Sequence, residues 1–388
     1  MRIGIEAQRL FRPEKHGMDR AVLELIKNLQ VLDHENEYFI FVQPDEDSAV
    51  IQETANFNIV EVDAGSYPVW EQIKLPKVAK KLNCDILHCT SNTAPLFTAT
   101  PLMTTIHDVI YMEGSVKALL KSKASAYQKF GNLYRRLIFS KVAKNSKQIL
   151  TVSEFEKENI TAHLSKTEAE KLTAIHNGVS GHFHNERNEQ RLQEVREKYG
   201  LPQNYMLHLG SKDPRKNTKR VLQAFGDYLK ASGETHKLVL MGYNKTTLQA
   251  DLAELQLHEV EQHIILPGYV ADQDLPQVFQ MAELFLFPSL REGFGIPVIE
   301  AMACGIPVIT SNTSSMPEVA GDAAHLVDPY STEQIVSAIA SIRDSKVYYQ
   351  SLVAKGLNRA KEFSWEAMAQ KVLEKYKVMF NQTQNLQS

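Results

Sequence analysis

Strand-like and helical stretches alternate along nearly the whole chain, and this order limits the possible fold more than any other feature. Short apolar or β-branched runs occur at 2–7, 38–43, 85–89, 102–108 and 148–153, and then at 205–210, 237–242, 263–268, 284–289, 306–310 and 324–327. Parallel strands joined by crossover helices give this order. The two sets of runs therefore predict an α/β protein with two doubly wound, Rossmann-like domains.

A polar, charged segment from Gly178 to Gly200 separates the two sets of runs. We place the domain boundary there, with an N-terminal domain over 1–180 and a C-terminal domain over 181–365. The chain has 388 residues, of which 43% are hydrophobic, and this suffices for two cores.

Charge and cysteine content narrow the functional classes. The formal net charge is −3, which argues against electrostatic binding of the whole protein to nucleic acid. Three cysteines in so long a chain indicate a reducing compartment, and the sequence has no apolar run of membrane-spanning length. We expect a cytoplasmic protein, or one held peripherally on the cytosolic face of the inner membrane.

The stretch from Arg291 to Glu318 concentrates the chemical signals. A glycine turn precedes Pro297, which favours a helix that begins near Pro297 and ends at Gly305. The apolar residues on nearly every face of this helix predict that it is buried, and the β-branched run that follows predicts a buried strand.

Two carboxylates stand in this apolar setting, Glu292 in the turn and Glu300 in the first turns of the helix. Side chains lean toward the N-terminus of their helix, so Glu300 should point back toward Glu292. Sugar or ribose hydroxyls would satisfy both carboxylates, and the free N–H groups of the turn suit a phosphate. The alternative is that both glutamates only complement the helix dipole.

The run EGFGIPVIE, with FLFPSLR before it and AMACGIPVITSNTSSMPEVAGDAA after it, resembles the signature of family 4 of the retaining glycosyltransferases. Weaker matches follow the family order at HGMDR, TIHD, TVSEFEKENI, HNGV, LGSKDPRKN and GYV. The resemblance implies the GT-B fold, in which two Rossmann-like domains face a cleft. It also implies that the C-terminal segment 366–388 crosses back to complete the first domain.

The loop LGSKDPRKN places Arg215 and Lys216 just before a helix. Paired cations there can neutralise a diphosphate as its bond to a sugar breaks. The resemblance assigns this role to Lys216. Many members of the family carry their arginine directly after the glycine, where this chain has Ser211, so Arg215 is the less direct match.

The resemblance assigns further roles around the same site. Glu292 would bind sugar hydroxyls and Glu300 the ribose, and the backbone of Phe294, Gly295 and Ile296 would hold the diphosphate and the sugar. Tyr269 and Val270 would frame the nucleotide base, although their sequence alone would also fit a turn.

Two residues of the first domain complete the predicted site. Gly17 precedes an amphipathic helix, and in the family a glycine loop here approaches the donor, although a plain turn also fits. His107 follows a strand, where open α/β sheets bind ligands, and could donate a hydrogen bond to the sugar. A structural histidine is the alternative.

Residues 114–153 contain nine lysines or arginines and no acidic residue. The same stretch carries apolar side chains at Leu119, Leu120, Tyr127, Phe130, Leu133, Tyr134, Leu137, Ile138 and Phe139. This composition is typical of a basic amphipathic helix that meets an anionic membrane surface, while a solvated face of a soluble enzyme is the alternative.

No group of residues indicates a metal site. The pair Asp272 and Asp274 directly precedes a helix, so helix capping explains it better than metal binding. The two histidines of HFH, His182 and His184, have no further ligands nearby in sequence. We therefore expect no metal and no cofactor, in agreement with a family that retains anomeric configuration without a metal ion.

These observations predict a hexosyltransferase that takes a hexose, with mannose favoured, from a nucleotide-diphosphate sugar. The acceptor would be a saccharide or a lipid-linked saccharide in cell-surface polysaccharide or lipopolysaccharide synthesis. UDP-glucose or UDP-N-acetylglucosamine is the alternative donor. A sugar-nucleotide epimerase of the same fold and a non-catalytic nucleotide-sugar-binding protein are the alternatives of another class.

Overall fold

The computed structural model describes residues 1–15, 17–121, 125–233 and 235–385. His16 of HGMDR, residues 122–124 of the basic stretch and the last three residues lie outside the described part. The chain forms two compact units, Met1–Gly178 with Trp365–Ser388, and Val179–Ser364. The boundaries placed from the sequence were 180/181 and 365/366.

Unit 1 is built on a seven-stranded parallel sheet with the order β3-β2-β1-β4-β5-β6-β7. Its strands are β1 (Arg2–Glu6), β2 (Glu37–Val42), β3 (Phe57–Glu61), β4 (Ile86–Cys89), β5 (Leu102–Thr105), β6 (Gln148–Thr151) and β7 (Leu172–Ala174). Its helices are α1 (Gly17–Leu32), α2 (Tyr67–Val69), α3 (Leu75–Lys81), α4 (Val116–Lys121), α5 (Ala126–Asn145), α6 (Glu154–Thr161), α7 (Lys166–Ala169) and α16 (Trp365–Asn385).

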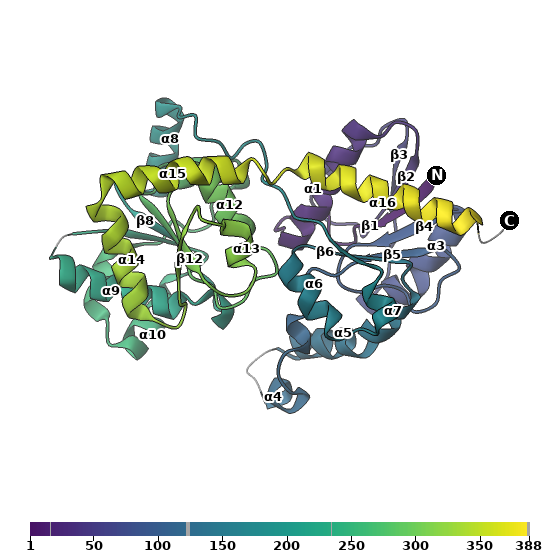
Figure 1. The fold of residues 1–388 in the computed structure, drawn as a ribbon, viewed down its shortest axis with the longest axis horizontal. Coiled ribbons are helices and arrows are strands. Elements are labelled where there is room, and N and C mark those ends of the chain that lie inside the picture. Colours follow the sequence, from purple (N-terminus) through teal and green to yellow (C-terminus); the bar gives the residue numbers. More distant parts are fainter. Residues whose placement is uncertain (16, 122–124, 234, 386–388) are drawn as a thin grey trace. The chain divides into compact units, whose positions relative to one another are not determined.

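Helices cover both faces of the unit 1 sheet, which lies between α1 and α16 on one side and α5 on the other (Figure 1). The core below α3 and α5 contains the fully buried side chains of Phe41, Trp70 and Leu87. On the opposite face α16 packs against α1, and the Tyr376 hydroxyl lies 2.6 Å from Nδ1 of His88 in β4. The last helix of the chain therefore belongs to the first unit, as the resemblance implied.

Unit 2 is built on a six-stranded parallel sheet with the order β10-β9-β8-β11-β12-β13. Its strands are β8 (Met206–Leu209), β9 (Leu238–Met241), β10 (Ile264–Ile265), β11 (Leu284–Phe287), β12 (Val308–Ser311) and β13 (His325–Val327). Its helices are α8 (Glu189–Tyr199), α9 (Thr218–Ser232), α10 (Lys245–Leu255), α11 (Leu275–Gln280), α12 (Ile296–Ala303), α13 (Met316–Ala320), α14 (Thr332–Asp344) and α15 (Lys346–Ala360).

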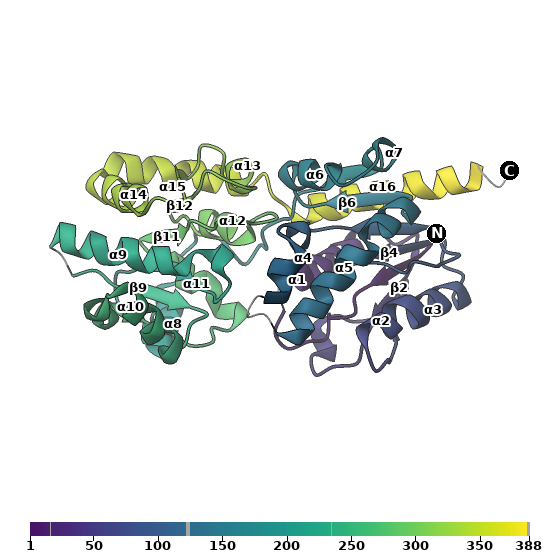
Figure 2. The same cartoon turned by 90° about the horizontal axis from the view of Figure 1, so that it is seen from below.

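The core of unit 2 fills the space between its sheet and α9, α10 and α14, where α9 and α14 lie side by side (Figure 2). Val221 and Phe225 of α9 and Ile339 of α14 are fully buried there. Two parallel sheets, each covered by helices, confirm the predicted α/β class. None of the helices within the described residues combines the length and apolar composition needed to cross a bilayer.

Two features differ from the sequence analysis. Within the polar segment 178–200, residues 189–199 form α8, whose Leu192 and Val195 are buried. Asp274 was predicted to cap the next helix, and this is wrong because its side chain makes no cap hydrogen bond to α11. Its buried carboxylate instead pairs with Arg191 and Lys198 of α8, the latter at 2.7 Å.

Candidate active site

The strongest pair of predicted site residues meets at the carboxyl edge of the unit 2 sheet. Lys216 lies in the loop after β8 and Glu292 in the loop after β11, and these two strands are neighbours in the sheet. Nζ of Lys216 lies 2.7 Å from Oε1 of Glu292 and 5.1 Å from the centre of the Phe287 ring. The side chains are 30% and 13% exposed, so a ligand in solution can reach this ion pair.

The loop that carries Lys216 is held from several sides. Asn217 adopts a left-handed conformation with φ of 59°, and its amide donates to the carbonyls of Pro288 (2.9 Å) and Pro329 (2.7 Å). The Leu290 N–H donates to the Arg215 carbonyl at 2.7 Å, which joins this loop to the Glu292 loop. The position of Lys216 therefore depends on the backbone of both loops.

Ser211 and His208 help to hold the loop that carries Lys216. The Ser211 N–H donates to the Thr218 hydroxyl at 3.1 Å, and that hydroxyl lies 3.1 Å from Nε2 of His208. Nδ1 of His208 donates to the Leu286 carbonyl at 2.7 Å. The pKa of His208 is lowered to about 4, mainly by burial; the Leu286 carbonyl opposes this effect and the charge of Lys216 adds to it. A neutral histidine thus supports the loop that carries Lys216.

Arg215 does not join the Lys216–Glu292 pair. Its guanidinium binds Asp213, with Nη2 at 2.5 Å from Oδ2 and Nε at 3.0 Å from the same oxygen. Burial opposes ionisation of Asp213, but the bonds and charge of Arg215 outweigh this and hold the pKa of Asp213 below its usual value. The two predicted cations therefore stand side by side in sequence with separate acidic partners.

The Glu292 loop leads into α12 through a turn that favours glycine. Gly295 has φ of +104°, a conformation that L side chains rarely adopt, and α12 begins at the next residue, one position before the predicted Pro297. The Ser315 hydroxyl lies 3.0 Å from the Glu292 carbonyl and 2.9 Å from the Phe294 carbonyl. The Phe294 ring packs edge-on against Phe363 at 5.6 Å between ring centres.

Glu300 is 6% exposed in the buried helix α12, among Ile299, Ala301 and Met302. Burial raises the pKa of the neighbouring Cys304 thiol, and the negative charge of Glu300 raises it further. Glu300 is therefore a buried carboxylate beside apolar side chains, where an ionised group is costly unless polar groups meet it.

The two residues assigned to the base differ in exposure. Tyr269 is 70% exposed in the loop after β10, while Val270 is buried at 6%. Both follow Gly268, which has φ of 74°.

In unit 1, His107 stands after β5 at the carboxyl edge of the sheet and is 9% exposed. Its Nε2 donates to the Thr90 carbonyl at 2.8 Å, and its backbone N–H donates to Oδ1 of Asn92 at 2.5 Å. Burial lowers the pKa of His107, against the raising effects of the Thr90 carbonyl and the charges of Asp108 and Asp19. Neutral His107 therefore presents Nδ1 as a hydrogen-bond acceptor, whereas the sequence analysis expected a donor.

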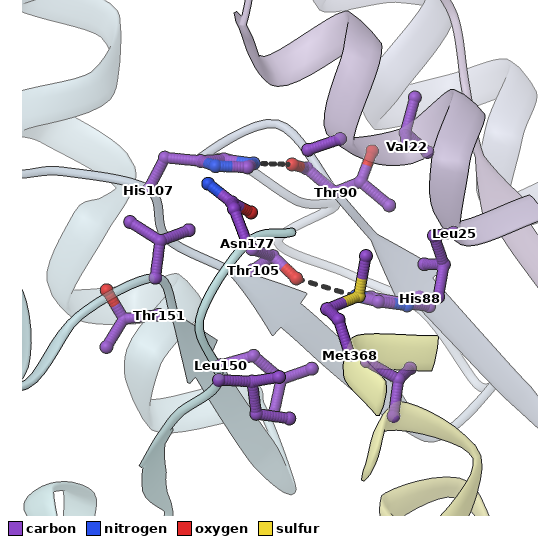
Figure 3. A pocket seen from close by; sticks show the side chains of 14 residues that line it. Val22, Leu25, His88, Thr90, Thr105, His107, Leu150, Thr151, Asn177 and Met368 are labelled. Carbon is purple, nitrogen blue, oxygen red and sulfur yellow. Dashed lines mark hydrogen bonds between the residues drawn. The ribbon is translucent and has the colours of Figure 1, made fainter. Parts of the chain in front are cut away.

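A small pocket of about 40 Å³ opens beside His107 (Figure 3). His107, Thr90 and Asn177 are among its polar lining residues, and Val22 of α1 and Met368 of α16 belong to its apolar wall. Gly17, at the start of α1, is exposed, and an added Cβ there would meet no atom within 4 Å. The volume suits one or two water molecules or a small substituent rather than a whole sugar.

The fold buries some apolar side chains of the basic stretch 114–153 and leaves others exposed. Four of its apolar side chains are 55–73% exposed, namely Leu120, Tyr127, Phe130 and Leu137. Ile138 and Phe139 are instead buried against the sheet. Only part of the apolar face is therefore available at the surface. Among the described residues, no group of three or more His, Cys, Asp or Glu side chains is arranged to hold a metal ion.

Several supporting residues were not predicted. Asn217, Ser315, His208 and Asn92 act through bonds to backbone atoms of distant loops. Asn217 could have been suspected, because asparagine is among the residues that tolerate a left-handed conformation before a helix. Asn92, with φ of 67°, shares this conformation, whereas Ser315 and His208 carry no local signal.

Comparison with known proteins identifies the family of this chain. The model for glycosyl transferases group 1 matches residues 190–359, and the model for glycosyltransferase family 4 matches residues 16–181. The O-antigen chain mannosyltransferase B of Escherichia coli is 34% identical over 236 residues, which cover 61% of this chain and 61% of that protein. The match thus spans less than two thirds of that relative.

Solved structures support the fold. A sucrose-phosphate synthase from Thermosynechococcus elongatus aligns with a TM-score of 0.75 at 18% identity, over 98% of this chain and 99% of that one. Anabaena HepE in complex with UDP and glucose aligns with a TM-score of 0.74 at 16% identity, over 97% and 100% of the two chains. These similarities confirm the GT-B fold and carry no information about the substrate of this chain.

Proposed function

Because this chain belongs to glycosyltransferase family 4, with the group 1 model matching its second half, we propose that it is a hexosyltransferase. The donor is a nucleotide-diphosphate sugar, with mannose favoured by the name of the relative from E. coli. The acceptor is a saccharide or a lipid-linked saccharide, in the synthesis of cell-surface polysaccharide or lipopolysaccharide.

The observation that carries the proposal is the ion pair between Lys216 and Glu292, 2.7 Å apart at the carboxyl edge of the second sheet. A ligand with an anionic end and a hydroxyl-bearing end can bind both partners at once. Lys216 would take the diphosphate, together with the N–H groups at the start of α12, and Glu292 would accept hydrogen bonds from the sugar.

The remaining residues fit supporting roles. Glu300 would accept hydrogen bonds from the ribose, which offsets the cost of its burial. Arg215 would add positive charge if the diphosphate draws it from Asp213. His107 would accept a hydrogen bond from a sugar hydroxyl through Nδ1, while Tyr269 and Val270 would frame the base.

We propose that transfer retains the anomeric configuration and needs no metal ion. The bond from the anomeric carbon to the phosphate oxygen breaks, the acceptor oxygen bonds to the same face, and its proton passes to the leaving phosphate. Lys216 stabilises the charge that develops on that phosphate. Activity should survive EDTA, and loss of activity with rescue by Mn²⁺ or Mg²⁺ would refute the metal-free mechanism.

A screen of GDP- and UDP-sugars by thermal shift, followed by NMR of the product, tests the assignment. We expect GDP-mannose to stabilise the protein most and the product to keep the donor's anomeric configuration. UDP-glucose is the second candidate, because HepE carries UDP and glucose in its solved complex. An epimerised nucleotide sugar without release of nucleoside diphosphate would instead identify an epimerase, and binding without turnover would identify a non-catalytic protein.

We also propose that unit 1 meets an anionic membrane through residues 114–153, since nine cations and no acid lie in that stretch, and Leu120, Tyr127, Phe130 and Leu137 are among its exposed apolar side chains. A lipid-linked acceptor would be presented at such a surface. Flotation with anionic vesicles should show binding that weakens with salt, and absence of such binding would reject this partner.

A further inference from the structure

A second surface of unit 1 carries the same chemistry as the basic stretch, and it is formed mostly by residues 72–80 and 96–102, which lie outside that stretch. An open groove of about 930 Å³ lies between α3, the loop 96–101 and the segment between α5 and β6. Pro101 and Lys147, which line it, directly precede β5 and β6. The groove is therefore at the amino edge of the sheet, opposite the edge that carries His107.

The groove has a cationic rim. Lys77 and Lys80 of α3 and Lys147 line it and are exposed, and none of the described residues that line it is acidic. A group of lysines that no acidic side chain of the groove lining balances attracts a polyanion or an anionic surface.

Large apolar side chains stand at the same groove. Phe97 is 75% exposed and Ile73 is 45% exposed. Nζ of Lys141 in α5 lies 4.3 Å from the centre of the Phe97 ring, a cation–π contact that keeps this ring at the surface. Exposed apolar side chains rimmed by charge mark interaction sites on proteins.

The loop that presents Phe97 is ordered by its own hydrogen bonds. The Asn145 amide donates to the Leu96 carbonyl at 2.8 Å, and the Thr100 N–H donates to the Thr98 hydroxyl at 3.1 Å. A ring held in this way loses little conformational freedom when it enters an interface. The exposed phenylalanine is thus pre-organised for contact.

We propose that this groove is a docking site for anionic phospholipid headgroups, with Phe97 and Ile73 entering the interfacial region of the bilayer. Lysines and apolar side chains on one surface match a bilayer, which offers phosphates above hydrocarbon, whereas nucleic acid or an acidic protein offers no hydrocarbon layer. The inference rests on the membrane partner proposed above and enlarges its contact surface. Docking at the amino edge leaves the carboxyl edge, with His107, open to substrates.

Co-sedimentation of the full chain with phosphatidylcholine vesicles that contain phosphatidylglycerol tests the site, with pure phosphatidylcholine as the reference. Lys77→Gln with Lys80→Gln should lower partitioning by roughly 30-fold, from the usual contribution of a lysine at an anionic surface. Phe97→Ala should lower it further and with less dependence on salt. The matched control is Lys346→Gln with Lys361→Gln, two exposed lysines of unit 2, which should change partitioning little.

Other outcomes separate the possibilities. If only Phe130→Ser with Leu137→Ser reduces binding, α5 alone is the docking surface and the groove proposal is wrong. Equal, lysine-dependent binding of an acidic peptide or of DNA, with no effect of Phe97→Ala, would also overturn it. The rate of sugar transfer to a soluble acceptor should be the same in the groove variants as in the unsubstituted protein. If the unsubstituted protein itself transfers no sugar, the proposed hexosyltransferase activity is wrong, whatever the result for the groove.

Discussion

The carboxyl edges of the two sheets carry different chemistry although both units share one architecture. In unit 2 the edge holds two ion pairs, Lys216 with Glu292 and Arg215 with Asp213, whose side chains are 13–40% exposed. In unit 1 the edge holds His107, buried, neutral and bonded to the Thr90 carbonyl. The two units thus present their predicted site residues differently, as partly exposed ion pairs in unit 2 and as a buried, hydrogen-bonded histidine in unit 1.

This division follows from what each environment permits. Partly exposed charges can exchange one partner for a ligand, since water lowers the cost of separating them. A buried group such as His107 cannot charge readily, so it serves best as a fixed acceptor. We therefore expect the leaving diphosphate to depend on unit 2 and the orientation of the sugar to depend on unit 1.

The largest effect should come from removing the unit 2 charge. Lys216→Ala should lower turnover by on the order of a hundredfold or more, as loss of a group that stabilises transition-state charge does. Steady-state kinetics with the purified variant measures this. Lys212→Ala, an exposed lysine of the same loop, is the matched control and should change turnover little. Unchanged activity of the Lys216 variant would remove the basis for assigning the diphosphate to this unit.

A smaller effect should come from replacing the neutral His107 of unit 1. His107→Asn keeps a polar group near the position of Nδ1, and His107→Gln keeps one near Nε2, which bonds Thr90. If Nδ1 accepts from the sugar, His107→Gln should lose roughly tenfold in kcat/KM, consistent with one lost hydrogen bond. The asparagine variant should then keep more activity.

The reverse order of the two variants would show that the Thr90 contact matters more, and His107 would then be a positioning residue. The pKa of His107 is lowered, so its proton should not bind near pH 6.5. A pH–rate profile of kcat/KM that fell with an apparent pKa near 6.5 and lost this limb in both variants would contradict the neutral assignment.

The fold was predictable wherever strands are buried on both faces. β4, β8 and β11 are nearly continuous apolar runs that stand out from the sequence. The edge strands β3 and β7 were missed, since polar residues such as Asn58, Glu61 and Thr173 interrupt them and part of their surface is exposed. An edge strand needs only one neighbour, so polar residues can make its sequence resemble a loop, whereas the edge strands β10 and β13 lie in apolar runs and were found.

Candidate site residues could be named from the sequence, but the contacts that the structure shows between them could not. Lys216 and Glu292 were each singled out by their motifs, yet 76 positions separate them and no local pattern joins them. The competition of Asp213 for Arg215 and the bond between His107 and Thr90 likewise depend on how neighbouring loops meet. Sequence reasoning names candidate residues, whereas their hydrogen-bond partners follow from packing.

The last prediction concerns stability rather than activity, and it compares one buried histidine in each unit. Burial lowers the pKa of His88 in β4 to about 3 and that of His208 in β8 to about 4. In the unfolded chain both pKa values should be near 6.5. The unfolded state therefore binds more protons as the pH falls below 6.5, so stability is complete above that pH and declines toward pH 4 and then 3.

At pH 5 each histidine should cost roughly 2 kcal/mol of unfolding free energy relative to pH 7.5. Denaturant unfolding at the two values measures this, and the probes separate the units, because Trp70 and Trp365 both belong to unit 1 while circular dichroism reports on both. His208→Asn, which can keep the bond to the Leu286 carbonyl, should reduce the pH effect seen by circular dichroism and leave the tryptophan signal unchanged. Equal midpoints at both pH values would contradict the lowered pKa values of both histidines.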